Sequence, residues 1–340
     1  MIFVNFNKKM KVIIPVAGAG AKLRPHTYTQ PKPLIPLAGK TILSFILDPL
    51  IEIGQKDFIF IIGYLGEKIK DYILINYPEI NSMFVVQNDL LGTGHAVYIT
   101  KEFVDENEEI LIVYGDTICD YNIEEVLNSS YSLLGVKKVN SPQKFGVAEL
   151  NSENWVKALI EKPTIPKSNL ALVGIYKILE SKLLFDIIEE AQTQNVNKQE
   201  IHLTDMINKM VQQNVKIGTF QIANWFDCGK KETLIETNAI LLNKVEFASE
   251  EIPFFDNTII VHPVSIASGC VIENSIIGPN VTIAENSTIK NSIINNSIIG
   301  TYTILEKVVL QTSLIGSDAQ IVGASQSLNI GDNTEIDLSK

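Results

Sequence analysis

A glycine loop follows the apolar run Val12–Ile14 and brings small residues together with positive charge. Gly18 and Gly20 come first, and Lys22 and Arg24 come after them. The apolar run predicts a buried parallel strand, and a loop at the carboxyl end of such a strand presents backbone N–H groups at the sheet edge where α/β proteins bind ligands. Because small residues admit a close approach and cations attract anions, we interpret this loop as a phosphate-binding site.

Neither of the two most familiar phosphate-binding loops is complete in this chain. A dinucleotide-binding fingerprint that begins at Gly18 needs a third glycine at position 23, where the chain has Leu23. The run Gly39–Thr41 ends like a Walker A loop, but the first glycine of that motif would fall on Leu34. The loop therefore belongs to another class of phosphate site.

Residues 18–36 resemble the signature of the sugar-1-phosphate nucleotidyltransferases, roughly G-x-G-T-R-L-x-P-x-T followed by P-K-P-L-x-P. The chain reads GAGAKLRPHT from Gly18 and PKPLIP from Pro31. Ala21 stands where the family usually has Thr or Ser, and Lys22 stands where it usually has Arg. Lysine lacks the planar fork that holds two phosphate oxygens, so these departures predict a weaker grip on the β- and γ-phosphates.

A second match to this family begins at Gln87, in the sequence QNDLLGTGHA. It matches Q-x-x-x-L-G-T-[AG]-x-A, whose Gln and following Gly lie on the base in the family. A side-chain amide donates and accepts together, so Gln87 can read the imide edge of uracil or thymine. The form Gly94-His95-Ala96 looks most like the N-acetylglucosamine-1-phosphate uridyltransferases, although His95 alone also fits a packed or solvent-facing helix residue. The nucleotide-binding residues that the resemblance implies are Ala17, Gly18, Gly20, Ala21, Gln87, Gly92 and Thr93.

Two aspartates lie in contexts that match the metal-binding elements of the family. Asp116 follows Gly115 after an apolar run, and Asp227 lies in Trp225–Gly229, which matches W-x-D-x-G. An Asp at a strand end is by itself often a turn or cap residue. Two carboxylates together with phosphate oxygens suit Mg²⁺, which keeps several waters and rarely has an all-protein cage. The resemblance therefore implies Mg²⁺ as the cofactor, held by Asp116 and Asp227.

Further matches concern the sugar phosphate. Glu161-Lys162-Pro163 matches the element E-K-P, in which the Glu takes a sugar hydroxyl and the Lys takes the sugar phosphate. Lys162 by itself also fits a solvated surface lysine. Three further elements complete the match: an aromatic-G-V element at Gly146, a later glycine strand with Val173 and Gly174, and an E-x-x-x-T-D element that begins at Glu200. The sugar-phosphate-binding residues that the resemblance implies are Gly146, Glu161, Lys162, Val173, Gly174 and Glu200.

These parts imply an in-line displacement. An oxygen of a sugar-1-phosphate attacks the α-phosphate of a nucleoside triphosphate, UTP or dTTP, and pyrophosphate leaves. A phosphate oxygen is already nucleophilic at neutral pH, so catalysis needs positioning and charge neutralisation but no general base. The expected partners are these two small-molecule substrates. The residues expected to act in catalysis are Lys22, Lys32, Asp116, Lys162 and Asp227.

Two other functions remain open on the sequence. An acyltransferase site in the C-terminal repeats would usually need a general-base histidine, and that region has only His262, at its start. A non-catalytic or regulatory homologue that binds a nucleotide sugar is suggested by Ala21 and Lys22. Release of pyrophosphate would distinguish the catalytic interpretation from the regulatory one.

The elements that must position these residues follow from the spacing of apolar residues. Short apolar runs alternate with segments of helical spacing between residues 12 and 114, which predicts parallel βαβ units. We expect a doubly wound, Rossmann-like sheet, of the nucleotide-diphospho-sugar transferase type that the resemblance implies. Strands with short connections follow between residues 131 and 178, where we expect an antiparallel lobe over the nucleotide-binding sheet. The complete α/β part is therefore expected to contain a mixed sheet.

Beyond residue 257 a repeat takes over. Ile or Leu recurs every five or six residues with Gly, Asn, Ser and Thr between, and the tetrapeptide SIIG at position 275 returns at 297 and, as SLIG, at 313. This period fits neither a helix nor a single strand and predicts a parallel β-helix with about three rungs per coil, which the resemblance makes left-handed. We expect an extension over residues 1–9, a nucleotidyltransferase domain over 10–250 and a β-helix domain over 251–340. The flat faces of a β-helix favour a homo-oligomer.

Composition narrows the class of protein further. Lys and Arg total 28 against 39 Asp and Glu, so the formal net charge of −11 disfavours binding to nucleic acid. The three cysteines lie far apart without metal-site spacing, as is typical of reduced cytosolic thiols. No run approaches the length of a membrane span, and the first residues lack the apolar region of a signal peptide. We expect a cytoplasmic protein without a membrane partner.

Overall fold

The computed structural model describes residues 10–106, 108–196, 199–244 and 252–323. The chain forms two compact units, residues 1–237 and residues 238–340. The predicted N-terminal extension, residues 1–9, and the predicted domain boundary at residue 250 lie outside the described residues. Within the described ranges, no helix is long and apolar enough to cross a membrane.

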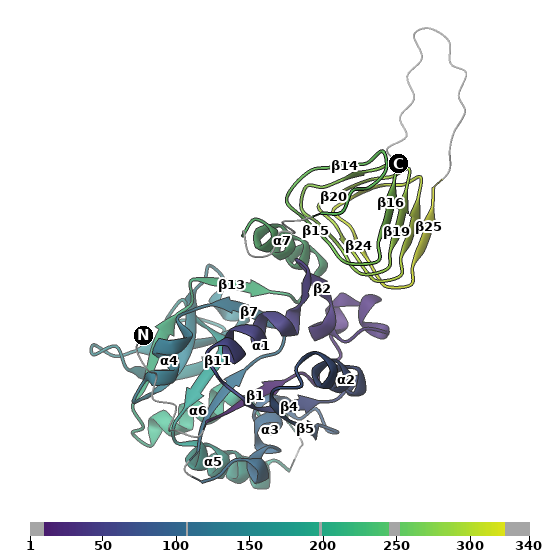
Figure 1. Ribbon diagram of the computed structural model, residues 1–340. Helices are drawn as coiled ribbons and strands as arrows, with labels where there is room; N and C mark the ends of the chain where they lie inside the picture. Colours follow the sequence, from purple (N-terminus) through teal and green to yellow (C-terminus); the bar gives the residue numbers. More distant parts are fainter. Residues whose placement is uncertain (1–9, 107, 197–198, 245–251, 324–340) are drawn as a thin grey trace. The chain divides into compact units, whose positions relative to one another are not determined.

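The first unit is built on one nine-stranded sheet (Figure 1). In sheet order its strands are β10 (Val156–Glu161), β9 (Gly146–Leu150), β11 (Leu170–Ile178), β6 (Glu109–Val113), β1 (Met10–Pro15), β4 (Asp57–Ile62) and β5 (Asn81–Val86), with β8 (Ser132–Lys138) also paired to β11 and β12 (Ile217–Gln221) paired to β8. Strands β6, β1, β4 and β5 are parallel, whereas β11 is antiparallel to β6. The sheet is therefore mixed, as predicted.

The antiparallel strands continue this sheet, so the prediction of a lobe lying over it is wrong. Residues Ile175–Ile178 of β11 pair with β6, and the same strand pairs with β8 along most of its length. One long strand thus joins the parallel and antiparallel parts through backbone hydrogen bonds. Pairings of this kind join residues far apart in the chain, and the local periodicity of the sequence does not encode them.

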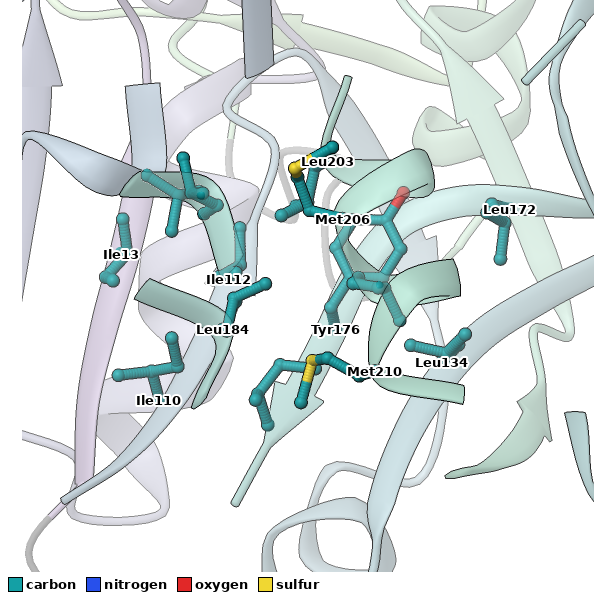
Figure 2. Close-up of a cluster of buried hydrophobic side chains, with 14 of the residues drawn as sticks. Ile13, Ile110, Ile112, Leu134, Leu172, Tyr176, Leu184, Leu203, Met206 and Met210 are labelled. Atoms are coloured by element: carbon teal, nitrogen blue, oxygen red, sulfur yellow. The ribbon is translucent and has the colours of Figure 1, made fainter. Parts of the chain in front are cut away.

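Helices supply the cores on both faces of the sheet. One core contains side chains of α1 (Ile42–Glu52), α2 (Gly66–Asn76) and α4 (Ile123–Asn128). The other contains side chains of α3 (Gly92–Tyr98), α5 (Ser181–Gln194) and α6 (Leu203–Gln212). Ile13 of β1 lies in this second core (Figure 2), while Val12 and Ile14 lie in the first, because side chains alternate along a strand. Burial on both faces explains the continuous apolar run at the start of the chain.

Two short antiparallel ladders complete the first unit. Strand β7 (Thr117–Asp120) pairs with β13 (Asn224–Asp227), and β2 (Pro36–Leu37) pairs with β3 (Lys40–Thr41). The register of the first ladder places Asp227 opposite Thr117, the residue after Asp116. Two aspartates that are far apart in the sequence are thereby brought to one place. Helix α7 (Lys231–Leu242) follows β13.

The second unit contains a parallel β-helix made of three four-stranded sheets. Their strands are β14 (Ile259–Ile260), β17 (Ile276–Ile277), β20 (Ile293–Asn295) and β23 (Val309–Gln311); β15 (Val264–Ile266), β18 (Val281–Ile283), β21 (Ile298–Ile299) and β24 (Leu314–Ile315); and β16 (Val271–Glu273), β19 (Thr288–Lys290), β22 (Ile304–Glu306) and β25 (Gln320–Val322). Ile272, Ile289, Leu305 and Ile321 stack in successive coils and belong to the core of the helix. A coil therefore holds three of the predicted rungs, which confirms the repeat.

Asparagines form one corner of each of the first coils. Asn257, Asn274 and Asn291 have positive φ angles of 46°, 49° and 51°. Asn enters this left-handed region more readily than most residues, because its short polar side chain can form local hydrogen bonds. The amide Nδ2 of Asn257 donates to Oδ1 of Asn274 at 2.9 Å. The asparagines of the repeat therefore serve both the turn and the stacking of coils.

Candidate active site

Two clefts of about 540 and 410 Å³ meet where β1 and β6 end. Residues that line both are Pro15, Gly18, Thr93, Tyr114, Asp116 and Asp227. Every residue predicted for the site lines one cleft or the other. Those in the larger cleft are Ala17, Gly18, Gln87, Gly92, Thr93, Asp116, Gly146, Glu161, Lys162, Val173, Gly174, Glu200 and Asp227. The smaller cleft adds Gly20, Ala21, Lys22 and Lys32.

The loop after β1 lines the smaller cleft, and its backbone favours glycine at position 20. Gly20 has a φ of 60°, and a Cβ there would lie 3.0 Å from Cγ2 of Thr27 and 3.1 Å from Cβ of Lys32. Thr27 Oγ1 also donates to the carbonyl oxygen of Gly20 at 3.0 Å. Ala21 and Lys22 follow in an exposed turn. The close approach of Gly20 to Lys32 therefore holds the two segments of the signature, the one that begins at Gly18 and the one that begins at Pro31, against each other.

An ion pair lies where the two clefts meet. Lys32 Nζ is 2.9 Å from Oδ2 of Asp116, with the lysine side chain 10% exposed and the aspartate side chain 52% exposed. Asp227 is exposed at the end of β13, and its Oδ1 accepts a hydrogen bond from the N–H of Gly229 at 3.0 Å. Two carboxylates and one ammonium group therefore face the same space.

In the larger cleft, Glu161 and Lys162 lie at the end of β10. Glu161 Oε2 accepts a hydrogen bond of 2.7 Å from Oγ1 of Thr204 on α6, and its Oε1 lies 3.6 Å from Lys162 Nζ. The Lys162 side chain is 62% exposed. The hydrogen bond from Thr204 fixes the carboxylate, while the ammonium group stays accessible. This combination suits one ligand that carries both hydroxyl groups and a phosphate.

The first turn of α3 is held to the segment before α6. Gly94 N–H donates to the carbonyl oxygen of Ile201 at 2.7 Å, and Thr93 Oγ1 accepts from the N–H of Leu203 at 3.0 Å. Gly92 has a φ of 93°, and a Cβ there would lie 2.6 Å from the same Ile201 oxygen. Only glycine fits this approach. The predicted base-binding turn is therefore fixed on two sides.

Trp225 lines the larger cleft, although it was not among the predicted site residues. Its Nε1 is buried and has no hydrogen-bond partner among the described residues. The ring lies edge-on to Phe145, with 4.8 Å between ring centres. A buried N–H donor without a partner is costly, so this atom is a candidate contact for a ligand oxygen. The W-x-D-x-G match was the signal in the sequence.

Two buried tyrosines also line the larger cleft without having been predicted. The ring of Tyr114 lies edge-on to that of Tyr176, with 5.7 Å between ring centres, and burial raises the pKa of the Tyr114 hydroxyl to about 12. Burial raises the pKa of Tyr176 well above its usual value as well. Both hydroxyls are therefore neutral at physiological pH and can donate hydrogen bonds. The sequence signal for Tyr114 was its position directly before Gly115-Asp116, at the end of a buried strand.

Residues 11–244 match the family described as Nucleotidyl transferase. The chain belongs to this family. Residues 243–339 match a second family, described as GlmU-like, C-terminal hexapeptide. These matches confirm the resemblance found in the motifs, and with it an enzyme of the nucleotidyltransferase class. They also confirm the predicted fold, a Rossmann-like mixed sheet followed by a left-handed hexapeptide β-helix.

Two curated relatives illustrate the extent of the similarity. The chain is 39% identical over 236 residues to the bifunctional protein GlmU of Methanocaldococcus jannaschii, which covers 69% of this chain and 55% of the relative. The chain thus spans about half the length of that relative. It is 30% identical over 362 residues to the low-salt glycan biosynthesis nucleotidyltransferase Agl11 of Haloferax volcanii, which covers 97% of this chain and 100% of the relative.

A solved structure shares the fold of the first unit. A putative glucose-1-phosphate thymidylyltransferase from Bacillus anthracis, in complex with a sucrose, superposes with a TM-score of 0.61 at 25% identity. The match covers 72% of this chain and 97% of that one. The nucleotidyltransferase fold therefore accounts for nearly the whole of the solved protein and for the first part of this chain.

Proposed function

We propose that this chain transfers a nucleotidyl group from UTP or dTTP to a sugar-1-phosphate. An oxygen of the sugar phosphate forms a bond to the α-phosphorus, the bond from that phosphorus to the α,β-bridging oxygen breaks, and pyrophosphate leaves. The observation that carries the proposal is the meeting of the two clefts at Asp116 and Asp227. One cleft holds the phosphate loop and the other holds Glu161 and Lys162, so the two substrates would meet at these carboxylates.

Members of this family generally use a divalent metal ion. The two carboxylates in this chain fit Mg²⁺. Asp116 and Asp227 supply two carboxylates, and the contact from Lys32 to Asp116 indicates a position that favours a cation. Mg²⁺ usually takes one or two protein carboxylates and fills its shell with water and phosphate oxygens. Accordingly, the described residues contain no group of three or more His, Cys, Asp or Glu side chains that could hold a metal. When bound, Mg²⁺ would offset negative charge on the α-phosphate.

The chain's own residues supply orientation and charge. The backbone of the glycine loop, with Lys22 and Lys32, holds the β- and γ-phosphates and stabilises the charge of the leaving pyrophosphate. Lys162 holds the sugar phosphate so that one oxygen faces the α-phosphorus, and Glu161 accepts a hydrogen bond from a sugar hydroxyl. Positioning and charge stabilisation of this kind account for most of the catalysis of phosphoryl and nucleotidyl transfer.

The choice of a pyrimidine nucleotide rests on Gln87, whose amide can pair with the imide edge of uracil or thymine. The Bacillus anthracis protein is named a putative glucose-1-phosphate thymidylyltransferase, which agrees with this choice. Three free cysteines agree with a cytoplasmic location. The homo-oligomer remains a prediction, supported by a ladder of aliphatic side chains on the outside of the β-helix, in which Ile259, Ile293 and Val309 are 59%, 42% and 76% exposed.

We do not extend the proposal to acyl transfer by the β-helix. Some relatives are named bifunctional, and one is named a sugar-1-phosphate nucleotidylyltransferase/acetyltransferase, from Sulfurisphaera tokodaii. Beyond residue 237, however, the sequence of this chain contains one histidine, His262, and that residue is exposed. An exposed side chain offers little control of the proton transfer that acyl transfer to an amine requires.

Ala21 and Lys22, where the phosphate loop departs from the family signature, are expected to limit the rate of nucleotidyl transfer. We expect the double variant Ala21→Thr, Lys22→Arg to raise kcat/KM for the nucleotide about threefold to tenfold, because the added hydroxyl and guanidinium group hold phosphate oxygens better. Arg24 does not fill this role, since its guanidinium lies over the ring of Tyr28, 5.1 Å from the ring centre. Initial rates at low nucleotide concentration measure the effect.

A matched control for that variant is Lys40→Arg. This exposed lysine pairs with Asp48 at 2.6 Å and lines neither cleft, so its replacement by Arg should leave the rate unchanged. If the double variant gains nothing over wild type, the loop does not limit the rate and the account of Ala21 and Lys22 is wrong.

A substrate panel tests the proposed function. The full chain is incubated with Mg²⁺, each of UTP, dTTP, CTP and GTP, and several sugar-1-phosphates, and released pyrophosphate is measured. We expect turnover with UTP or dTTP and with at least one sugar phosphate. Binding of nucleotide sugar without pyrophosphate release from any pair would contradict the proposal and favour a regulatory binding protein.

A further inference from the structure

His95 holds the side chain of Gln87. Gln87 Nε2 lies 3.2 Å from Nδ1 of His95 and 3.5 Å from the carbonyl oxygen of Gly92. A carbonyl oxygen can only accept, so the end of the Gln87 amide that faces both partners is the NH₂ group. The Nδ1 atom of His95 is then the acceptor. The two contacts together set the direction in which the amide points.

The amide oxygen of Gln87 is left for the ligand. Gln87 is 7% exposed and lines the larger cleft, and no hydrogen bond from the described residues reaches its Oε1. The N3 atom of uracil or thymine carries a hydrogen, whereas N3 of cytosine carries a lone pair. An oxygen held in this direction accepts a hydrogen bond from the first and repels the second. The direction of the amide therefore decides which base is accepted.

We propose that His95 is a positioning residue that makes the site selective for uracil or thymine over cytosine. The inference rests on the proposed function in one respect, the assignment of Gln87 to the base. His95 acts through Gln87 and is not assigned a contact with the nucleotide. Burial lowers the pKa of the imidazole, while the charge and the backbone of Asp89 act in the opposite direction. The effect of burial favours the neutral ring that can accept from Gln87.

The test compares kcat/KM for UTP and for CTP, with one sugar-1-phosphate, in the full chain. His95→Ala removes the acceptor and frees the amide to turn, so the UTP/CTP ratio should fall about tenfold. His95→Leu keeps more of the side-chain volume and should give the same fall if the Ala variant is unstable. In His95→Asn, the side-chain oxygen can accept near the position of Nδ1, so the ratio should stay within about threefold of wild type.

Tyr98→Phe is the matched control on the same helix. The Tyr98 hydroxyl donates to Glu189 at 3.2 Å, and Tyr98 lines neither cleft, so the ratio should not change. If His95 only supports packing, the Ala and Leu variants lower both kcat/KM values equally, and an unchanged ratio overturns the inference.

Equilibrium binding of UTP and CTP, measured by calorimetry without sugar phosphate, separates this inference from the proposed function. A wild-type chain that releases no pyrophosphate refutes the function, while the binding ratios of the same variants still decide the role of His95. A wild-type chain that binds UTP and CTP equally, or binds neither, overturns the inference.

Discussion

Replacing either Asp116 or Asp227 by Asn should lower kcat about a thousandfold. Each substitution keeps the shape of the side chain and removes its negative charge, so on the proposed function the variant loses a ligand for the divalent ion and the charge stabilisation that depends on it. Both side chains line the space where the two clefts meet. The measurement is the rate of pyrophosphate release at saturating concentrations of both substrates and of Mg²⁺.

Stability should change little in these variants. Asp116→Asn also breaks the ion pair with Lys32, but the aspartate side chain is 52% exposed, and ion pairs at such positions contribute about 1 kcal/mol or less. The melting temperature should therefore stay close to that of wild type, which separates loss of chemistry from loss of fold.

Asp120→Asn is the control for this pair. Asp120 is the last residue of β7, the strand that begins directly after Asp116. Its Oδ2 accepts a hydrogen bond of 2.8 Å from Asn224, and the residue lines neither cleft. Its replacement should change kcat by less than about twofold. Near-normal turnover in either Asp116→Asn or Asp227→Asn would refute the assignment of the metal ligands.

Lys162→Met should lower kcat/KM for the sugar-1-phosphate about a hundredfold and leave the affinity for UTP unchanged. Methionine keeps the length and apolar stem of the side chain and removes the charge. A hydrogen bond to a charged group contributes about 1.5–3 kcal/mol, which corresponds to roughly ten- to a hundredfold in kcat/KM, and the loss is larger where the bond aligns the nucleophile. Steady-state rates over a range of sugar phosphate concentrations, with calorimetry for UTP, measure the two quantities.

Lys157→Met, on the strand that precedes Lys162, is the comparison. Lys157 lies in β10, the strand that leads to Lys162, but it lines a separate cleft near Pro166 and Asn169. Its replacement should leave both quantities unchanged. A Lys162 variant whose UTP affinity falls as much as its kcat/KM would contradict the assignment, because the lysine would then act on the nucleotide.

The parts of the fold that repeat or alternate could be predicted from the sequence. Val12–Ile14 is apolar because both faces of β1 are buried, and the inward Ile and Leu residues of the β-helix recur at the spacing of its rungs. Gly20 could be predicted because its left-handed φ and the close approach of Thr27 and Lys32 favour glycine. In these cases the cause of the residue type is local, so the sequence carries it.

Other features depend on contacts between distant segments, and the sequence does not show them. The pairing of β11 with β6, the ladder of β7 with β13 and the ion pair of Lys32 with Asp116 all join segments far apart in the chain. The β7–β13 ladder involves only four residues on each strand, too few for a clear alternation. The unpaired Nε1 of Trp225 depends on the packing around it, so only the motif pointed to that residue.

The most direct test of the proposed reaction is a ³¹P NMR spectrum of the full chain with Mg²⁺, UTP or dTTP, and the sugar-1-phosphate that gives the highest rate. The account predicts that the triphosphate signals decrease while the paired signals of a nucleotide diphosphate sugar and the signal of pyrophosphate grow in equal amounts. Inorganic phosphate in place of these products, or a spectrum that does not change although both substrates bind, would contradict it.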